Sequence, residues 1–270
     1  SYLGALNAFN AYQPKFVEVP TDNGGLIPEE LDKILETTPN CKFIYVIPDF
    51  QNPTGRTWSM ERRQKFMEVV NKHNLPVLED NPYGELRYEG TILPSLKSMD
   101  TKGLVMFLGT FSKIFCPGLR LGWIAAEHSL LSEFVKIKQS ADLHTSNFDQ
   151  GVADAYMEQY DLDEHVKEIV ALYKHRRDLI LESMEKYFPA GTEWTHPEGG
   201  LFLWLTFPEG VSARKVFNKC IEMKVAGVIG DAFYPNQKTD RSMRINYSNM
   251  PDDRIVEGIQ RMAKAIKECM

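Results

Sequence analysis

Apolar runs and amphipathic segments alternate along the first 126 residues of the chain. Four runs have the aliphatic and aromatic character of strands buried in a parallel sheet, at 42–47, 77–78, 104–108 and 121–126. Two segments between them have apolar residues at helical spacing, namely 27–38 and 59–73. This order predicts an α/β fold in which helices flank a mostly parallel central sheet.

The second half of the chain has a different pattern. Residues 129–187 are helical in period and strongly charged, which predicts two long helices with a break near 160–161. Short strands and helices follow, at 201–207, 212–223, 225–229, 243–247 and 252–268. We therefore expect a large domain over residues 1–155 and a small C-terminal α/β domain over residues 156–270.

Composition narrows the class of protein. The chain has 270 residues, a net charge of −6 and no lysine and arginine cluster of the kind that binds nucleic acid. No apolar stretch approaches the ~20 residues that a membrane helix needs. The four cysteines are far apart, and no pair has zinc-ligand spacing. This usage favours a reduced, cytoplasmic protein that binds no metal.

The most informative motif places a lysine among hydroxyl groups. Lys113 follows Thr110 and Ser112, and Arg120 comes one loop later. A lysine attacks a carbonyl carbon only when burial or a nearby cation destabilises its ammonium form, and hydroxyls with a guanidinium can bind a phosphate. The combination suggests pyridoxal 5'-phosphate (PLP) held as a Schiff base. The simpler alternative is a surface lysine in a polar loop.

Two other predicted strands end in loops with candidate site residues. Ligands of parallel sheets bind at the carboxyl ends of the strands, so these loops are expected near the same site. Asn52 lies in the first loop, where its side chain either binds a ligand or forms a plain turn. Asp80 ends the next strand, and a buried acid needs a cationic partner. That partner is either a protonated pyridine nitrogen or a basic side chain.

The chain resembles the fold-type-I PLP enzymes, and among them the class I and II aminotransferases. The matching residues, in the family's order, are Asn52-Pro53-Thr54-Gly55, Asp80, Tyr83, Ser112-Lys113, Arg120 and Arg244. The segments Tyr2-Leu3-Gly4-Ala5-Leu6, 139–145 and 197–204 are most similar to the 2-aminoadipate/kynurenine aminotransferase branch. The resemblance runs from Tyr2 to the C-terminal helix.

The resemblance implies how the cofactor ring would be held and used. Lys113 would bind PLP as an aldimine and, once freed, would move a proton between substrate and cofactor. Asp80 would keep the pyridine nitrogen protonated. Asn52 and Tyr83 would donate hydrogen bonds to the phenolic oxygen, and Tyr2 would stack on the ring. The implied catalytic residues are Lys113, Asp80 and Tyr83.

The resemblance also implies sites for the two anionic groups. Thr110, Ser112 and Arg120 would bind the cofactor phosphate, although the family more often has serine at the position of Thr110. Arg244, helped by Asn52, would bind the substrate α-carboxylate in a bidentate fork. Arg241 is a less fitting candidate for the same role, because the strand and the Asn-Tyr-Ser that follow match the family only at Arg244.

A segment that family members carry before the stacking aromatic is not found in this chain. The resemblance therefore implies a fragment whose large domain is incomplete at its N-terminus. In the family this segment includes a helix whose N-terminus binds the phosphate. We expect the chain alone to bind PLP weakly or not at all, and to leave a sheet edge or an apolar face without its partner.

The predicted function is PLP-dependent transfer of an amino group from an amino acid to a 2-oxo acid. Specificity is expected to be broad or 2-aminoadipate-like. The full-length protein is expected to be a homodimer with no membrane or nucleic-acid partner. One alternative is the aminotransferase-like effector domain of a PLP-sensing transcriptional regulator. Another is a different fold-type-I reaction, such as β-elimination or decarboxylation, which would use the same cofactor residues.

Overall fold

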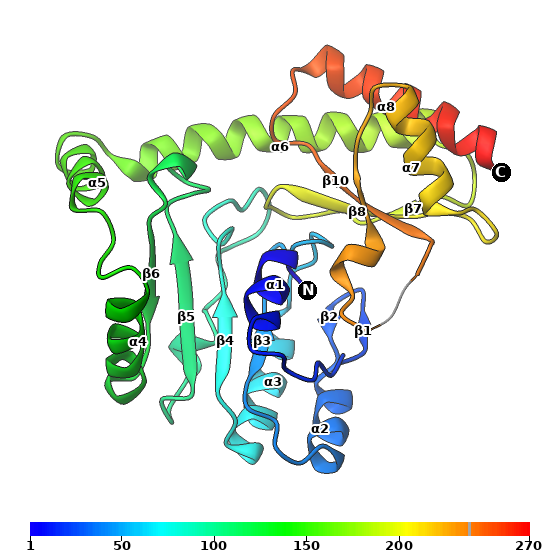
Figure 1. Cartoon of the computed structure of the whole chain (residues 1–270). Coiled ribbons are helices and arrows are strands. Elements are labelled where there is room, and N and C mark those ends of the chain that lie inside the picture. The colour runs from blue at the N-terminus through cyan, green and yellow to red at the C-terminus, as the bar shows by residue number, and fades with distance from the viewer. Residues whose placement is uncertain (237–238) are drawn as a thin grey trace. The chain divides into compact units, whose positions relative to one another are not determined.

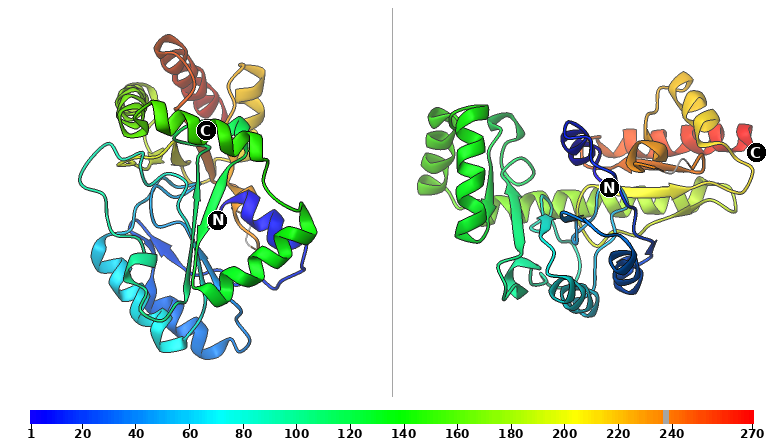
Figure 2. Two further views of the ribbon diagram at one scale, coloured as in Figure 1. Left: turned by 90° about the vertical axis from the view of Figure 1, so that its left-hand side faces the viewer. Right: turned by 60° about the horizontal axis from the view of Figure 1, so that its bottom comes forward.

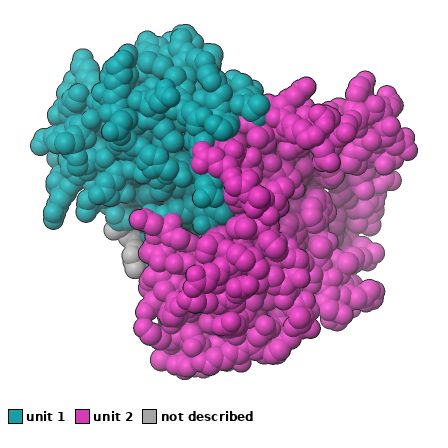
Figure 3. Space-filling view, turned by 180° about the vertical axis from the view of Figure 1, so that it is seen from behind, with its two compact units in different colours: residues 1–18, 50–57, 171–270 teal, residues 19–49, 58–170 magenta. Residues whose placement is uncertain are grey.

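The chain forms two compact units, coloured separately in Figure 3. The computed structural model describes every residue except 237–238. Unit 1 comprises residues 1–18, 50–57 and 171–270, and unit 2 comprises residues 19–49 and 58–170. Each unit therefore combines segments that are distant in sequence. The expected division of the chain at residue 155 stays a prediction.

A four-stranded sheet in the order β3-β4-β5-β6 forms the centre of unit 2 (Figure 1). The strands β3 (Ile44–Val46), β4 (Val77–Asp80) and β5 (Val105–Thr110) are parallel, as predicted. β6 (Gly122–Ala125) instead runs antiparallel to β5. The loop between them contains only a 3₁₀ turn at Pro117–Leu119, whereas parallel neighbours need a long crossover connection.

Two helices and a small hairpin complete the β3 side of unit 2. Helix α2 (Pro28–Thr37) begins with a proline, and the Ser59 side chain caps α3 (Met60–His73) by accepting from the Arg62 backbone N–H. β1 (Thr21–Asp22) and β2 (Gly25–Leu26) form a hairpin that sequence periodicity did not indicate. Arg62 holds this hairpin, because it donates to both carboxylate oxygens of Asp22 at 2.8 Å.

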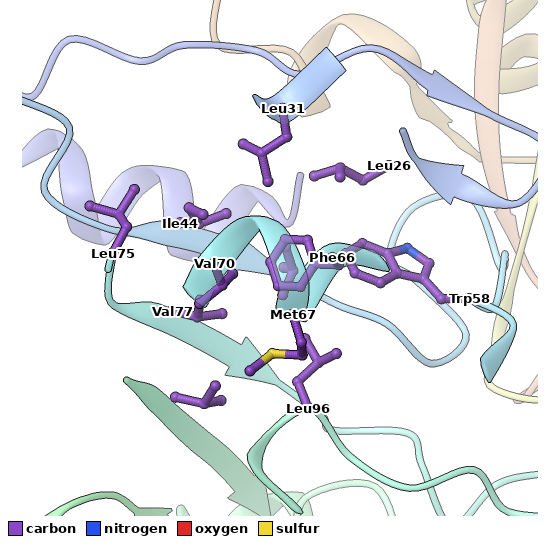
Figure 4. Close-up of a cluster of buried hydrophobic side chains, with 12 residues drawn as sticks. Leu26, Leu31, Ile44, Trp58, Phe66, Met67, Val70, Leu75, Val77 and Leu96 are labelled. Atoms are coloured by element: carbon purple, nitrogen blue, oxygen red, sulfur yellow. The ribbon is translucent and has the colours of Figure 1, made fainter. Parts of the chain in front are cut away.

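The core of unit 2 lies between α3 and the sheet (Figure 4). Trp58 and Phe66 meet edge to face with ring centroids 5.1 Å apart. Phe66 and Val70 are four residues apart, so they lie on the same face of α3. Both are fully buried, which shows that this face of the helix packs into the core. The remaining buried members are Leu26, Leu31, Ile44, Val46, Met67, Leu75, Val77, Leu96 and Val105. This packing fixes the strands from which the site loops emerge.

Three helices follow the sheet, where the sequence predicted two. They are α4 (His128–Ala141), α5 (Asn147–Gln159) and α6 (Leu162–Tyr187). The break expected near residue 160 is confirmed, and a second break precedes α5, whose cap is Ser146. α4 lies beyond the edge strand β6 (Figures 1 and 2). Among the described residues, no helix has both the length and the apolarity needed to cross a bilayer.

Unit 1 contains a second sheet, in the order β7-β8-β10-β9, in which all neighbours are antiparallel. Its strands are β7 (Glu193–Trp194), β8 (Phe202–Thr206), β9 (Val228–Ile229) and β10 (Ser242–Asn246). Helix α7 (Ala213–Glu222) packs against α8 (Asp252–Cys269), and both lie on one side of this sheet (Figure 1). The unit also holds α1 (Leu3–Asn10). The predicted α/β fold is confirmed.

Candidate active site

The predicted site residues of unit 2 lie where β4 and β5 end. Asp80 is the last residue of β4 and pairs in register with Leu108 of β5. The Asn81 backbone N–H continues the ladder by donating to the Leu108 carbonyl at 3.0 Å. Thr110 ends β5, and Lys113 follows in the next turn. Two neighbouring parallel strands thus deliver the acid and the lysine to one edge of the sheet, as their sequence positions predicted.

Asp80 has an environment that favours a cationic partner. Burial raises the pKa of the Asp80 carboxyl, and a hydrogen bond from the Tyr45 hydroxyl, at 2.6 Å from Oδ2, partly opposes this rise. A nearby positive charge would lower the free energy of the carboxylate. Tyr45, in the middle of β3, was missed by sequence reasoning. Its hydroxyl within an otherwise apolar run was the available signal.

Hydrogen bonds of Thr110 close the base of the Lys113 loop. The Thr110 hydroxyl donates to the Leu121 carbonyl at 3.0 Å and accepts from the Ser112 backbone N–H at 3.1 Å. The turn itself is closed by Phe115, whose backbone N–H donates to the Phe111 carbonyl at 2.9 Å. A hydroxyl has one proton, and here that proton points to Leu121. Phosphate binding by Thr110 stays a prediction that requires this proton to turn.

Arg120 is exposed and has a left-handed backbone conformation, with φ of 55°. Its Nη1 donates to the Pro117 carbonyl at 3.0 Å within the same loop. A guanidinium carries five N–H donors, so Arg120 is able to bind an anion while it holds Pro117. Its predicted role in phosphate binding is compatible with this arrangement and stays a prediction.

Tyr83 lies in the turn that follows β4. Its side chain is buried, with 4% of the residue exposed, and the Leu86 backbone N–H donates to the Tyr83 carbonyl at 2.8 Å. The turn therefore places an aromatic hydroxyl three residues beyond Asp80. This spacing agrees with the predicted pairing of Asp80 and Tyr83 around one cofactor ring.

In unit 1 the structure brings Asn52 and Arg244 together. Arg244 is the central residue of β10, and its Nη1 donates to Asn52 Oδ1 at 2.8 Å. The guanidinium carbon lies 4.2 Å from the ring centroid of Phe202 and 5.1 Å from that of Phe233. Sequence reasoning missed both rings. Phe202 lies in β8, which pairs with β10, and Phe233 ends a 3₁₀ turn that follows β9, the other neighbour of β10. Cation–π attraction and packing fix the orientation of this guanidinium.

Arg241, the other candidate for binding the substrate carboxylate, binds a backbone carbonyl. Arg241 is exposed at the start of β10, and its Nε and Nη2 both donate to the Phe207 carbonyl, at 3.3 and 3.0 Å. This arrangement supports Arg244 as the carboxylate-binding residue.

Two glycines allow the Asn52 loop to pack closely on the sheet of unit 1. Gly55 has φ of +70°, and a Cβ there would lie 2.4 Å from the Phe202 carbonyl oxygen. Gly200 has φ of +75°, and its Cβ would lie 2.5 Å from Cβ of Phe50. The close approach of Gly200 to Phe50 therefore requires a residue without a side chain. Asn52 itself is 3% exposed, so its side chain is held in a defined position.

Tyr2 immediately precedes α1 and is 41% exposed. Its ring lies against Gly4, where a Cβ would come within 2.5 Å of Tyr2 Cζ. The Tyr2 ring can occupy this position because residue 4 has no side chain. Stacking of Tyr2 on a cofactor ring stays a prediction.

The chemistry of these side chains fits PLP. Asp80 offers a half-buried carboxylate for a pyridinium nitrogen, Lys113 an amine, and Tyr83 a hydroxyl for a phenolic oxygen. The Lys113 loop adds Ser112 and Arg120 as anion-binding groups. The position of Asp80 at the end of β4, where among the described residues only the Tyr45 hydroxyl donates to its carboxylate, is the most specific of these features, because such a carboxylate gains from a cationic partner.

Comparisons with known proteins agree with this fit. Residues 1–262 match the family model of class I and II aminotransferases. The chain is 43% identical over 274 residues to aromatic-amino-acid aminotransferase 1 of Thermococcus litoralis, covering 100% of this chain and 66% of that protein. A more distant relative is the HTH-type transcriptional regulator YisV of Bacillus subtilis, which is 28% identical, with 100% of this chain and 55% of that protein covered.

Solved structures give the same result. A kynurenine aminotransferase from Pyrococcus horikoshii, in complex with PMP, superimposes with a TM-score of 0.95 at 41% identity, covering 99% of this chain and 67% of that one. LysN, an α-aminoadipate aminotransferase from Thermus thermophilus complexed with a phosphopyridoxyl-leucine, gives 0.94 at 32% identity, with 100% and 69% covered. This chain thus spans about two thirds of the length of these relatives.

The family and the fold type predicted from the sequence are both confirmed, since the family model covers nearly the whole chain and the fold matches PLP-dependent structures. The chain belongs to the class I and II aminotransferases.

Proposed function

We propose that the protein is a PLP-dependent aminotransferase that moves an amino group between an amino acid and a 2-oxo acid. The observation that carries this proposal is the delivery of Asp80 and the Lys113 loop to one edge of the sheet by two parallel strands. When bound, PLP supplies an electron sink for the charge that develops at the substrate α-carbon.

The residues of this chain would divide the chemistry among them. Asp80 would hold a proton at the pyridine nitrogen, because its half-buried carboxylate is stabilised by the cation. Lys113 Nζ would bind the cofactor, and would then move a proton between the substrate α-carbon and C4′ of the cofactor. Tyr83 and Asn52 would donate hydrogen bonds to the phenolic oxygen.

The two anionic groups would have separate sites. Ser112, Arg120 and Thr110 would bind the phosphate, and Tyr2 would cover the ring. Arg244 would bind the α-carboxylate, held in orientation by Asn52 and the Phe202 ring. Because every amino acid has this carboxylate, Arg244 does not select among side chains.

Specificity, assembly and location belong to the same proposal. Relatives named for aromatic amino acids, kynurenine and 2-aminoadipate support broad specificity that includes 2-aminoadipate, with 2-oxoglutarate as acceptor. The family resemblance supports a homodimer of the full-length protein. The scattered cysteines, none of them in a disulfide, support a cytoplasmic location.

Transamination by the full-length protein tests the proposal. PLP-loaded protein is incubated with a panel of amino acids and 2-oxoglutarate, and glutamate formation is measured. We expect turnover with several donors. Absence of transamination, combined with DNA binding that responds to PLP, would favour the regulator alternative. Pyruvate and ammonia from β-substituted substrates, or CO₂ release, would instead indicate another fold-type-I reaction.

A further inference from the structure

A buried carboxylate lies just beyond β3, outside the set of cofactor-binding residues. The Asp49 side chain is 6% exposed, and its Oδ1 accepts from Nη2 of the fully buried Arg63 at 2.6 Å. Arg63 also donates from Nε to the Trp58 carbonyl at 3.3 Å and from Nη1 to the Pro94 carbonyl at 3.0 Å. Since Arg63 is held at three points, it fixes the Asp49 carboxylate in place.

The same carboxylate faces both ends of the segment that carries Tyr83. Asn81 Nδ2 donates to Asp49 Oδ2 across a long 3.5 Å contact. Arg87, whose side chain is 7% exposed, places Nη2 3.6 Å from Asp49 Oδ1. Asn81 and Arg87 bracket the Tyr83 turn, so one fixed group contacts the segment before and after it.

A second buried acid does not substitute for Asp49 in this role. Glu79 is fully buried, but its two carboxylate oxygens accept from the backbone N–H groups of Leu96 and Lys97, each at 2.8 Å. Glu79 therefore caps the 3₁₀ turn Lys97–Met99. Asp49 instead lies within ion-pair distance of both Arg63 and Arg87.

We propose that Asp49 is a positioning residue: held by Arg63, it anchors residues 81–87 and so sets where the Tyr83 hydroxyl meets the phenolic oxygen of the cofactor. This inference rests on the proposed function. A hydrogen bond to that oxygen stabilises its anionic form, so loss of the bond raises the pKa of the cofactor chromophore. Asp49 thus acts on the chromophore only through Tyr83.

Titration of the chromophore tests the inference in full-length, PLP-loaded protein. Asp49→Asn keeps the size of the side chain but removes its charge. We expect the pKa seen in the visible spectrum to rise by roughly half to one pH unit. Tyr83→Phe should raise it at least as much, and Asp49→Asn should add nothing in the Tyr83→Phe background. The matched control is Asp22→Asn, which removes another arginine partner in the same unit and should leave the pKa unchanged.

An unchanged pKa in Asp49→Asn, or equal effects of Asp49→Asn with and without Tyr83, would overturn the inference. If Asp49→Asn does not fold, Arg87→Met removes the contact with Asp49 at the far end of the segment, together with the hydrogen bond from Arg87 Nη1 to the Glu89 carbonyl. The same shift and the same non-additivity are expected.

Hydrogen exchange of cofactor-free protein gives a readout independent of the chemistry. The Leu86 amide, which donates to the Tyr83 carbonyl, should exchange faster in Asp49→Asn than in Asp22→Asn. Equal exchange in the two variants would also overturn the inference. A wild-type protein without a lysine-linked chromophore would contradict the proposed function, while this exchange measurement would still decide whether Asp49 anchors the segment.

Discussion

Two arginines of this chain are predicted to bind anions, and the structure holds them in different ways. Arg244 lies in the middle of β10, next to two aromatic rings and bonded to a buried asparagine. Arg120 lies in a loop before the edge strand β6, where it is exposed and donates to a carbonyl of its own loop. Arg244 is oriented by contacts within a sheet, and Arg120 by a single turn.

The difference follows from where each residue lies in its sheet. The strand β10 has a neighbour on each side. In its neighbour β8, Trp204 pairs with Arg244, and the ring of Phe202, two residues away, contacts the Arg244 guanidinium. The loop between β5 and β6 lies outside the sheet; the Thr110 hydroxyl closes its base, and Phe115 packs against Tyr156 of α5. Less conformational entropy is lost on binding where the side chain is already ordered. We therefore expect the carboxylate site to be preorganised and the phosphate loop to rearrange when it binds.

The largest effect is expected at Lys113, which lies in the loop between β5 and β6. Lys113→Ala should abolish transamination, since one side chain supplies both the nucleophile and the proton carrier. Borohydride reduction of wild-type holoprotein followed by peptide mapping should place the pyridoxyl group on Lys113. A label on a different lysine would contradict the assignment, and Lys102→Ala, in the same unit, serves as the control.

Removal of the acid should have the next largest effect. Asp80→Asn retains the shape of the side chain and its contact with Tyr45, but removes the negative charge that would stabilise a pyridinium. Turnover should fall by several orders of magnitude while PLP stays bound, which absorbance and single-turnover kinetics would measure separately. Near-normal turnover would show that Asp80 has only a structural role.

Lysine substitutions of the two arginines compare the two sites directly. Arg244→Lys should raise KM for amino and oxo acids alike by about 10- to 100-fold, because a bidentate, charge-assisted pair is lost. Arg120→Lys should weaken PLP binding by less than about tenfold, since exposed ion pairs contribute little. Steady-state kinetics and PLP titration would measure these effects. A larger loss at Arg120 would reverse the comparison between a preorganised and an adaptable site.

Sequence reasoning succeeded where a residue's position in the chain decides its place. Asp80 and Lys113 could be assigned to one edge of the sheet because Asp80 ends one buried parallel strand and Lys113 follows the next. Tyr45 and the rings beside Arg244 could not, because those contacts depend on which strands are neighbours and in what register. The hydrogen bond from the Thr110 hydroxyl to the Leu121 carbonyl could not be predicted either, since it depends on β6 running antiparallel to β5.

The smallest effect is expected on the free energy of unfolding of unit 2, which carries the loops that follow β4 and β5. Burial raises the pKa of Glu79 to about 6, above the ordinary value of 4.5, against the opposing hydrogen bonds from Leu96 and Lys97. The native state therefore binds more protons than the unfolded state between about pH 4.5 and 6, so this group's contribution to stability falls as pH rises through that window. At about 1.4 kcal/mol for each pKa unit, the loss amounts to roughly 2 kcal/mol.

Denaturant unfolding of wild-type protein and Glu79→Gln, from pH 4.5 to 7, isolates this contribution. Glutamine does not titrate, so the stability difference between the two proteins should change by about 2 kcal/mol across the window and stay constant above it. Asp22→Asn, at an exposed ion pair of the same unit, should show no such change over this range. A difference that stays constant from pH 4.5 to 7 would mean that Glu79 keeps an ordinary pKa despite its burial. In that case the hydrogen bonds to its carboxylate would have to balance its desolvation.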